Sequence, residues 1–192
     1  MEKLYPKIKF VYSLPYDRLL SGYENRPFDE RQDKEVKKYI KRLQARWNEI
    51  NNSILQTLEK AIKNEWQEKE IKCYVVKHCK YNGISAPLTM KLDLDLDYVI
   101  DTLIHELAHI LVSYNFKKYK IIEQELKKRF PEENQKIILH IYINFIELKV
   151  LKKIFDPVFV NKIIKRVEEF KGIGKAYKIV LNKESDLKKL FE

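Results

Sequence analysis

Glycine and long apolar runs are scarce in this chain of 192 residues. With only 4 glycines, the chain contains no stretch with the composition of a flexible linker, so its length fits one domain or one domain with an extension. Apolar residues nevertheless make up 45% of the sequence, which is enough to build a hydrophobic core. We therefore expect a single domain over residues 1–192.

Cysteine is also scarce, and nothing in the sequence resembles a membrane span. The 2 cysteines, Cys73 and Cys79, are too few for a disulfide framework, which favours a cytoplasmic protein. The first residues lack the apolar stretch of a signal peptide. The longest apolar stretch, residues 137–151, is interrupted by polar side chains, so we expect no contact with a membrane.

Positive charge dominates, with 38 Lys and Arg against 28 Asp and Glu and a net charge of +10. Such a surface can contact nucleic acid. The lysines of residues 149–192, however, alternate with apolar residues at helical spacing, which is typical of solvated helix faces. Frequent Lys, Ile and Glu with few Cys and Met resemble the composition of hyperthermophile proteins.

The first half of the chain combines one long helical pattern with two short strand patterns. Apolar residues recur at steps of three and four over residues 33–66, which indicates one long helix or two abutting helices. Residues 71–80 and 84–94 have the patterns of strands. Pro87 favours an edge position for the second strand, because proline cannot donate a hydrogen bond to a neighbouring strand.

The second half of the chain shows helical periodicity. We expect Asp97 to cap a helix over residues 97–114. Pro131 is predicted to stand at the first position of a helix over residues 131–155, where its missing N–H is tolerated. Another helix is expected over residues 158–171.

Together these patterns predict an α+β fold that is predominantly helical. Residues 1–30 contain 3 of the prolines and several aromatic residues, and we expect an extended N-terminal segment there. Residues 31–157 are predicted to form the core. Residues 158–192 are predicted to form a basic, helical C-terminal extension.

One segment carries the pattern of a metal site. His105, Glu106 and His109 form the motif H-E-x-x-H. Two histidines at i and i+4 project from one helix face, so both can bind one ion, and the intervening glutamate can reach a water beside it. The flanking residues are apolar on nearly all sides, and buried histidine and glutamate are costly unless they are paired or bound to metal. We therefore expect one zinc ion at His105 and His109.

The motif and its flanks resemble the zincin metallopeptidases over under half of the chain. The resemblance implies that His105 and His109 are zinc ligands and that Glu106 is the general base and proton shuttle. It further implies that the strand over residues 84–94 binds the substrate and that a second helix crosses the motif helix at the metal. The fold would then be a small α+β body with a zincin-like core.

The third zinc ligand is expected on the helix over residues 131–155. His140, Asn144 and Glu147 lie on one face of that helix at spacing i, i+4 and i+7. His140 is the preferred ligand, because imidazole suits zinc well and histidine is rare in this chain. Glu147 is the alternative, because the gluzincin branch uses a glutamate at this place. If His140 binds zinc, Asn144 or Glu147 would orient a ligand imidazole.

These residues predict a zinc metallopeptidase that acts on a peptide or protein substrate. Three tyrosines, at positions 114, 119 and 142, are candidates to stabilise the oxyanion. One alternative is a non-catalytic zinc-binding protein with a basic surface that contacts nucleic acid. Another is an inactive zincin whose N-terminal segment covers the cleft.

Overall fold

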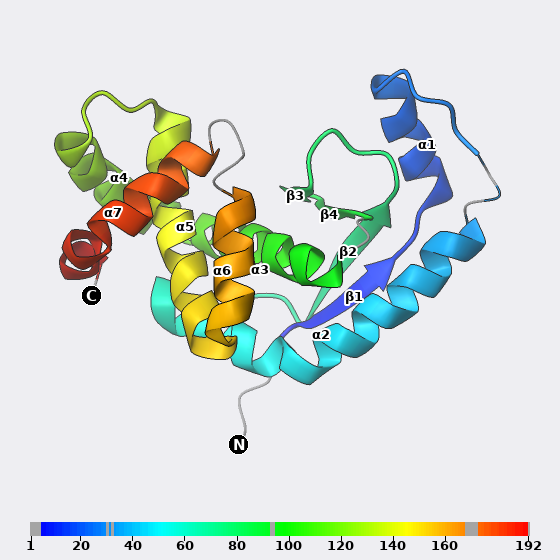
Figure 1. The fold of residues 1–192 in the computed structure, drawn as a ribbon, viewed down its shortest axis with the longest axis horizontal. Coiled ribbons are helices and arrows are strands. Elements are labelled where there is room, and N and C mark those ends of the chain that lie inside the picture. The colour runs from blue at the N-terminus through cyan, green and yellow to red at the C-terminus, as the bar shows by residue number, and fades with distance from the viewer. Residues whose placement is uncertain (1–4, 30, 32, 93–94, 168–172, 192) are drawn as a thin grey trace.

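The computed structural model describes residues 5–29, 31, 33–92, 95–167 and 173–191. In these residues the chain is an α+β protein that is mostly helical, as the sequence predicts, with seven helices and one four-stranded sheet. Figure 1 shows the sheet and α1 at one end of the molecule, α4 to α7 at the other end, and α3 between them. The helices are α1 (Leu14–Tyr23), α2 (Asp33–Ile62), α3 (Leu96–Ser113), α4 (Phe116–Arg129), α5 (Gln135–Ile154), α6 (Pro157–Val167) and α7 (Ile173–Phe191).

The sheet is mixed and has the order β1-β2-β4-β3. β1, β2 and β4 are parallel, and β3 pairs antiparallel with β4. The expected single edge strand over residues 84–94 is therefore two strands, because residues 86–87 form a turn between them. Of these two strands, only β3 is at the edge of the sheet. The strands are β1 (Lys7–Val11), β2 (Glu70–Val76), β3 (Gly83–Ser85) and β4 (Leu88–Lys91).

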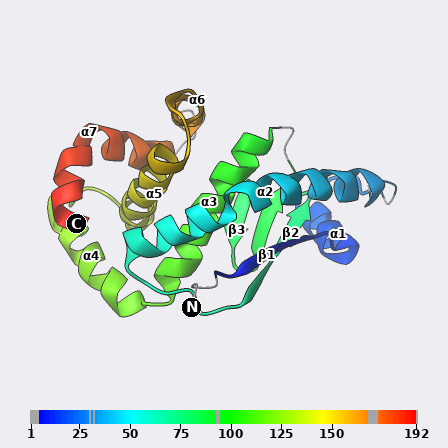
Figure 2. The same ribbon diagram turned by 90° about the horizontal axis from the view of Figure 1, so that it is seen from below.

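The long helical pattern in the first half of the chain forms one continuous helix, α2. Its apolar face is buried, and it contacts β1 and β2 as well as α3 and α5. Figure 2 shows α2 running along the molecule from the region of the sheet to the region of α4 and α5. This helix therefore joins the two ends of the molecule into one core. Its buried apolar residues are Val36, Tyr39, Leu43, Trp47, Ile54, Leu55, Leu58 and Ile62.

The two helices that carry the predicted site residues begin slightly away from the predicted positions. Asp95, not Asp97, caps α3, and its side chain accepts a hydrogen bond from the backbone N of Asp97 at 3.1 Å. Asn134 caps α5, so Pro131 precedes this helix and does not stand in its first turn. The capping residue of α3 thus comes earlier in the sequence than expected, and α5 begins later than expected. The apolar residues that each helix buries still lie within it.

The N-terminal region is extended, as expected, only in its first part. Residues 7–11 form β1 at one edge of the sheet, whereas residues 14–23 form helix α1. Ser13 caps α1 by accepting from the backbone N of Tyr16, and Pro15 stands in the first turn, where a proline is tolerated. The prolines that suggested an extended chain therefore include one that marks the start of a helix.

The C-terminal residues expected to form a helical extension contain the helices α6 and α7, and both helices pack against the core. α7 packs against α5, and Tyr177, Val180 and Leu187 are buried between them and their neighbours. α6 contacts α3 and α5 and reaches the candidate site through Val167. Across the described part of the chain, no helix is both long enough and apolar enough to cross a membrane.

Candidate metal centre

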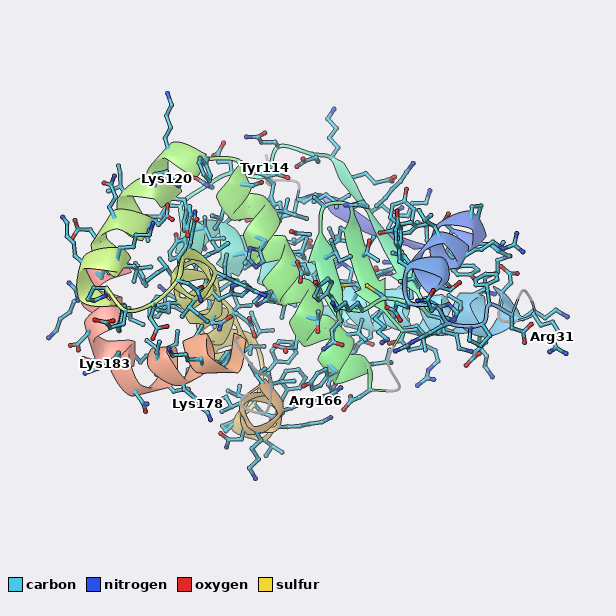
Figure 3. All side chains as sticks on the ribbon, turned by 90° about the horizontal axis from the view of Figure 1, so that it is seen from above. Arg31, Tyr114, Lys120, Arg166, Lys178 and Lys183 are labelled. Atoms are coloured by element: carbon cyan, nitrogen blue, oxygen red, sulfur yellow. The ribbon has the colours of Figure 1, made fainter. Side chains whose placement is uncertain are left out.

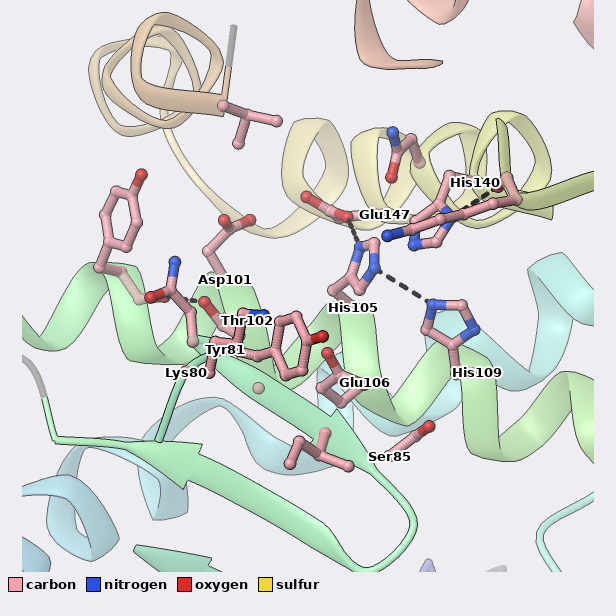
Figure 4. Close-up of a pocket in the computed structure, with 17 residues that line it drawn as sticks. Lys80, Tyr81, Ser85, Asp101, Thr102, His105, Glu106, His109, His140 and Glu147 are labelled. Atoms are coloured by element: carbon pink, nitrogen blue, oxygen red, sulfur yellow. Dashed lines mark hydrogen bonds and ion pairs between the residues drawn. The ribbon is translucent and has the colours of Figure 1, made fainter. Parts of the chain in front are cut away.

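A cleft of about 540 Å³ lies between the sheet edge and the helices. One wall is the segment 80–85, which includes β3, whereas α3 and α5 together form the floor and the opposite wall (Figure 4). Residues 5–29 do not line it, so the described part of the N-terminal region is not the cover that we considered. Besides segment 80–85, the cleft is lined by Tyr98, Asp101, Thr102, His105, Glu106, His109, Lys136, His140, Asn144, Glu147 and Val167.

Helix α3 presents the H-E-x-x-H residues to this cleft because its other faces are covered. Its apolar side chains are packed against the sheet, α2 and α5. His105 and His109 are one turn apart, so they project from the same face. The buried apolar residues that fix this orientation are Val99, Ile100, Leu103, Ile104, Leu107, Ala108, Leu111 and Val112.

Three histidines from two helices meet at the floor of the cleft. One potential ligand atom from each of His105, His109 and His140 lies within 4.8 Å of the others. The Nε2 atoms of His105 and His109 are 3.2 Å apart. Two nitrogens bound to a tetrahedral zinc at about 2.0–2.1 Å would be about 3.3–3.4 Å apart, so this spacing fits one ion between them. The structure therefore brings together the three residues that the sequence proposes as ligands.

Hydrogen bonds to Nδ1 orient two of these rings. His105 Nδ1 lies 2.6 Å from a carboxylate oxygen of Glu147, and His140 Nδ1 lies 2.7 Å from the backbone oxygen of Lys136 (Figure 4). A carbonyl or carboxylate oxygen accepts, so Nδ1 carries the proton in both rings. Each Nε2 then keeps a lone pair for a metal, which is the usual arrangement around a histidine ligand.

The surroundings of the three imidazoles favour their neutral forms. Burial is the main cause that lowers the pKa of His109 to about 2, with the neighbouring charges of His105 and His140 adding to it. Burial also lowers the pKa of His140 to about 4 and that of His105 below its ordinary value. A neutral imidazole is the form that binds a metal ion, so the site does not have to lose protons near neutral pH.

Glu147 lies behind His105 and not beside His109 and His140. Its side chain is 3% exposed, and besides His105 it forms a hydrogen bond with Asp101, one turn before His105 on α3. Burial raises the pKa of Glu147 to about 8 and raises that of Asp101 well above its usual range. Their hydrogen bond raises the pKa of Asp101 and lowers that of Glu147, so Asp101 is the donor and Glu147 the acceptor of this bond. In this geometry Glu147 orients His105, which is the second of the two roles considered for it.

Glu106 faces the cleft from the side of the sheet edge. It is largely buried, and this burial raises the pKa of its carboxyl group. Gly83 of β3 lies directly against it, since a Cβ at position 83 would stand 2.7 Å from Glu106 Cγ and 2.7 Å from Thr102 Cγ2. Glycine is thus required for the close approach of the edge strand to the H-E-x-x-H helix.

The three tyrosines predicted as oxyanion donors lie away from this cleft. Tyr114 donates a hydrogen bond to Glu68, and the rings of Tyr119 and Tyr142 stack 6.2 Å apart on another side of α3. The cleft contains Tyr81 and Tyr98 instead. The side chain of Tyr81 extends into the cleft on the side of Glu106 (Figure 4).

Two outer members of this site, Asp101 and Lys136, were not predicted from the sequence. A signal existed for each, because Asp101 precedes His105 by one helical turn and Lys136 precedes His140 by one turn. No family model, curated protein or solved structure matches the chain. The geometry of the cleft is therefore the basis on which a function can be assigned.

Proposed function

We propose that the protein is a zinc-dependent metallopeptidase with a zincin-like core. The observation that carries this proposal is the convergence of three histidine side chains beside Glu106, in a cleft bordered by an edge strand. His105, His109 and His140 would hold one zinc ion. When bound, zinc would polarise the scissile carbonyl and lower the pKa of a water molecule to about 7.

Glu106 is the general base of the proposed reaction. Its burial raises the pKa of the carboxyl group toward the working range of a base at neutral pH. Glu106 takes a proton from the attacking water and passes it to the nitrogen of the leaving amine. The absence of a side chain at Gly83 leaves room for the Glu106 side chain beside β3.

The edge strand β3 supplies a place for an extended peptide. β4 pairs with one side of β3, and no described strand pairs with the other. A substrate peptide can add to such an edge through main-chain hydrogen bonds. Residues 83–85 line the cleft, so a peptide bound there would run past Glu106 and the histidines. Tyr81, which extends into the same space, is our candidate for the donor that stabilises the oxyanion.

The Glu106→Gln substitution tests this function. We expect the variant to keep one zinc per chain and to lose about 10²- to 10⁴-fold in peptide cleavage, because only proton transfer is removed. Zinc is measured by elemental analysis, and cleavage is measured on a mixed peptide library by mass spectrometry. Full zinc occupancy in the wild type without cleavage of any peptide would refute the peptidase and leave the zinc site intact.

The alternative of a non-catalytic zinc protein that contacts nucleic acid has less support. A closed structural site needs four protein ligands, whereas the cluster found in the described residues has three. The basic side chains labelled in Figure 3 are also not gathered at one place, because Arg31 lies at one end of the molecule and Lys120, Lys178 and Lys183 lie at the other. Salt-sensitive binding of the protein to DNA or RNA would favour this alternative.

A further inference from the structure

The charged side chains of the cleft are divided between its floor and its walls. The acidic residues Asp101, Glu106 and Glu147 are all buried in the floor. The basic residues are Lys80 on the sheet side and Lys136 on α5, and both are exposed. A molecule that enters the cleft therefore meets positive charge before it reaches any carboxylate.

The acidic groups of the floor already have partners or a role. Glu147 accepts from His105 and Asp101, and Glu106 is the proposed base. The two lysines differ in this respect, because neither forms an ion pair with a carboxylate of the described residues. Lys80 lies over the Tyr81 ring, 5.8 Å from its centroid.

Lys136 stands close to the candidate metal ligands. It is in the first turn of α5, and its backbone oxygen accepts from His140 Nδ1. Lys136 and His140 are one helical turn apart on α5 and both line the cleft, so they lie on the same face of this helix.

An ammonium group that is not paired with a carboxylate adds its charge to that of a zinc ion bound nearby, and an anion bound in the cleft would compensate both charges. Lysines elsewhere in the molecule are commonly paired with acids, as Lys120 is with Glu123 at 2.7 Å and Lys152 is with Glu184 at 2.6 Å. With zinc bound to neutral histidines, the cleft would carry excess positive charge, which attracts anionic ligands and speeds their binding. The compensating anion is therefore expected on the substrate.

We propose that the peptidase cleft selects substrates that carry a carboxylate near the scissile bond, and that Lys136 binds this carboxylate. This inference rests on the proposed function. A carboxylate can come from an acidic side chain or from a free C-terminus. Both have the same chemistry, and a lysine binds either as a point charge with rotatable donors.

Peptide binding to the zinc-loaded Glu106→Gln variant tests the inference without requiring cleavage. The probes are short, fluorescent, alanine-based peptides with one glutamate or one glutamine at each position in turn, each made with a free and with an amidated C-terminus. We expect a carboxylate to tighten binding by about tenfold or more, the typical contribution of a hydrogen-bonded charge. The position of the effect distinguishes a side chain from a C-terminus.

Substitutions of Lys136 identify the group responsible. In the same background, Lys136→Gln should remove the preference for the carboxylate, and Lys136→Glu should reverse it. Lys153→Gln is the matched control, because it removes the same charge from an exposed position at the other end of α5. This control should keep the full preference, and zinc content should be equal in all variants.

Two results would overturn the inference: equal binding of glutamate and glutamine peptides, or a preference that survives in Lys136→Gln. The second result would mean that the carboxylate contacts zinc or another residue. Failure of the proposed function would look different. Selective, Lys136-dependent binding by a wild-type protein that cleaves no peptide would refute the peptidase and retain the site for a carboxylate ligand.

Discussion

The four histidines of this chain occupy two different environments. His78, which comes after β2, has one carboxylate partner, since Asp17 Oδ1 lies 2.8 Å from His78 N and 3.1 Å from His78 Nδ1. The same oxygen accepts from the backbone N of Lys77 at 3.1 Å. At the candidate metal centre, by contrast, His105 and His109 face each other through their Nε2 atoms.

This difference separates a structural histidine from a candidate ligand. Asp17 belongs to α1, so its bonds to His78 connect this helix to the end of β2 and explain why both side chains are buried. In the cluster, the Nε2 atoms of two neutral rings lie 3.2 Å apart, a spacing that fits two ligands of one ion and, in the metal-free protein, a hydrogen bond from His109 to His105. Burial alone does not make a histidine a candidate ligand, whereas convergence of three ring nitrogens does.

The largest expected effect is loss of zinc from the His140→Ala variant. This change removes a proposed ligand, so we expect zinc affinity to fall by more than about 100-fold, beyond the range typical of groups that only orient a ligand. Glu147→Gln should cost about 10- to 100-fold, because Glu147 acts through His105. Competition with a chelator measures both affinities.

His78→Ala is the control for the other environment. It removes a buried histidine of the same chain, and its folded fraction should bind zinc with the affinity of the wild type. A larger loss for Glu147→Gln than for His140→Ala would instead make Glu147 the third ligand. Loss of zinc from folded His78→Ala would remove the distinction between the two environments.

A change in the environment of His78 is expected to lower the stability of the protein and to leave its zinc affinity unchanged. Asp17→Asn keeps the shape of the side chain but weakens the charge-assisted bonds to His78 and to the backbone of Lys77. We expect the free energy of unfolding to fall by about 1–2 kcal/mol. Denaturant unfolding of the zinc-free protein measures this change, with zinc affinity as the second readout. A stability equal to that of the wild type would show that Asp17 is not what holds α1 in place.

The sequence predicted those parts of the fold in which the spacing of apolar residues alone determines the secondary structure. The long helix α2 and the helices α3 and α5 are predicted by apolar spacing, because their buried faces are continuous. In the N-terminal region helix α1 was not predicted, because prolines are common both in extended segments and in the first turn of a helix. The division of residues 83–91 into two strands depends on a turn that strand periodicity does not reveal.

The candidate site was predictable in its residues and less so in their roles. Helical spacing places His105, His109 and Glu106 on adjoining faces, and it places His140 and Glu147 on another helix. Whether Glu147 contacts the metal or a histidine depends on how α3 and α5 pack against each other. The spacing of residues within one helix does not predict this packing. The position of Tyr81 likewise depends on how closely β3 approaches α3. Gly83, which permits this close approach, is the residue of the sequence that could have predicted it.

The smallest expected effect concerns Asp101, the outermost residue of the metal centre. If Asp101 holds the proton between the two carboxyl groups, the amide of Asp101→Asn can donate to Glu147 in its place. Zinc affinity should then change by less than about threefold, whereas loss of a group that orients a ligand normally costs about tenfold or more. Asp101→Leu is the matched control, because its side chain has the same branched arrangement of heavy atoms and no donor, and it should weaken zinc binding by about tenfold. Equal losses in the two variants would show that donation by Asp101 is not what positions Glu147, and that His105 depends on Glu147 alone.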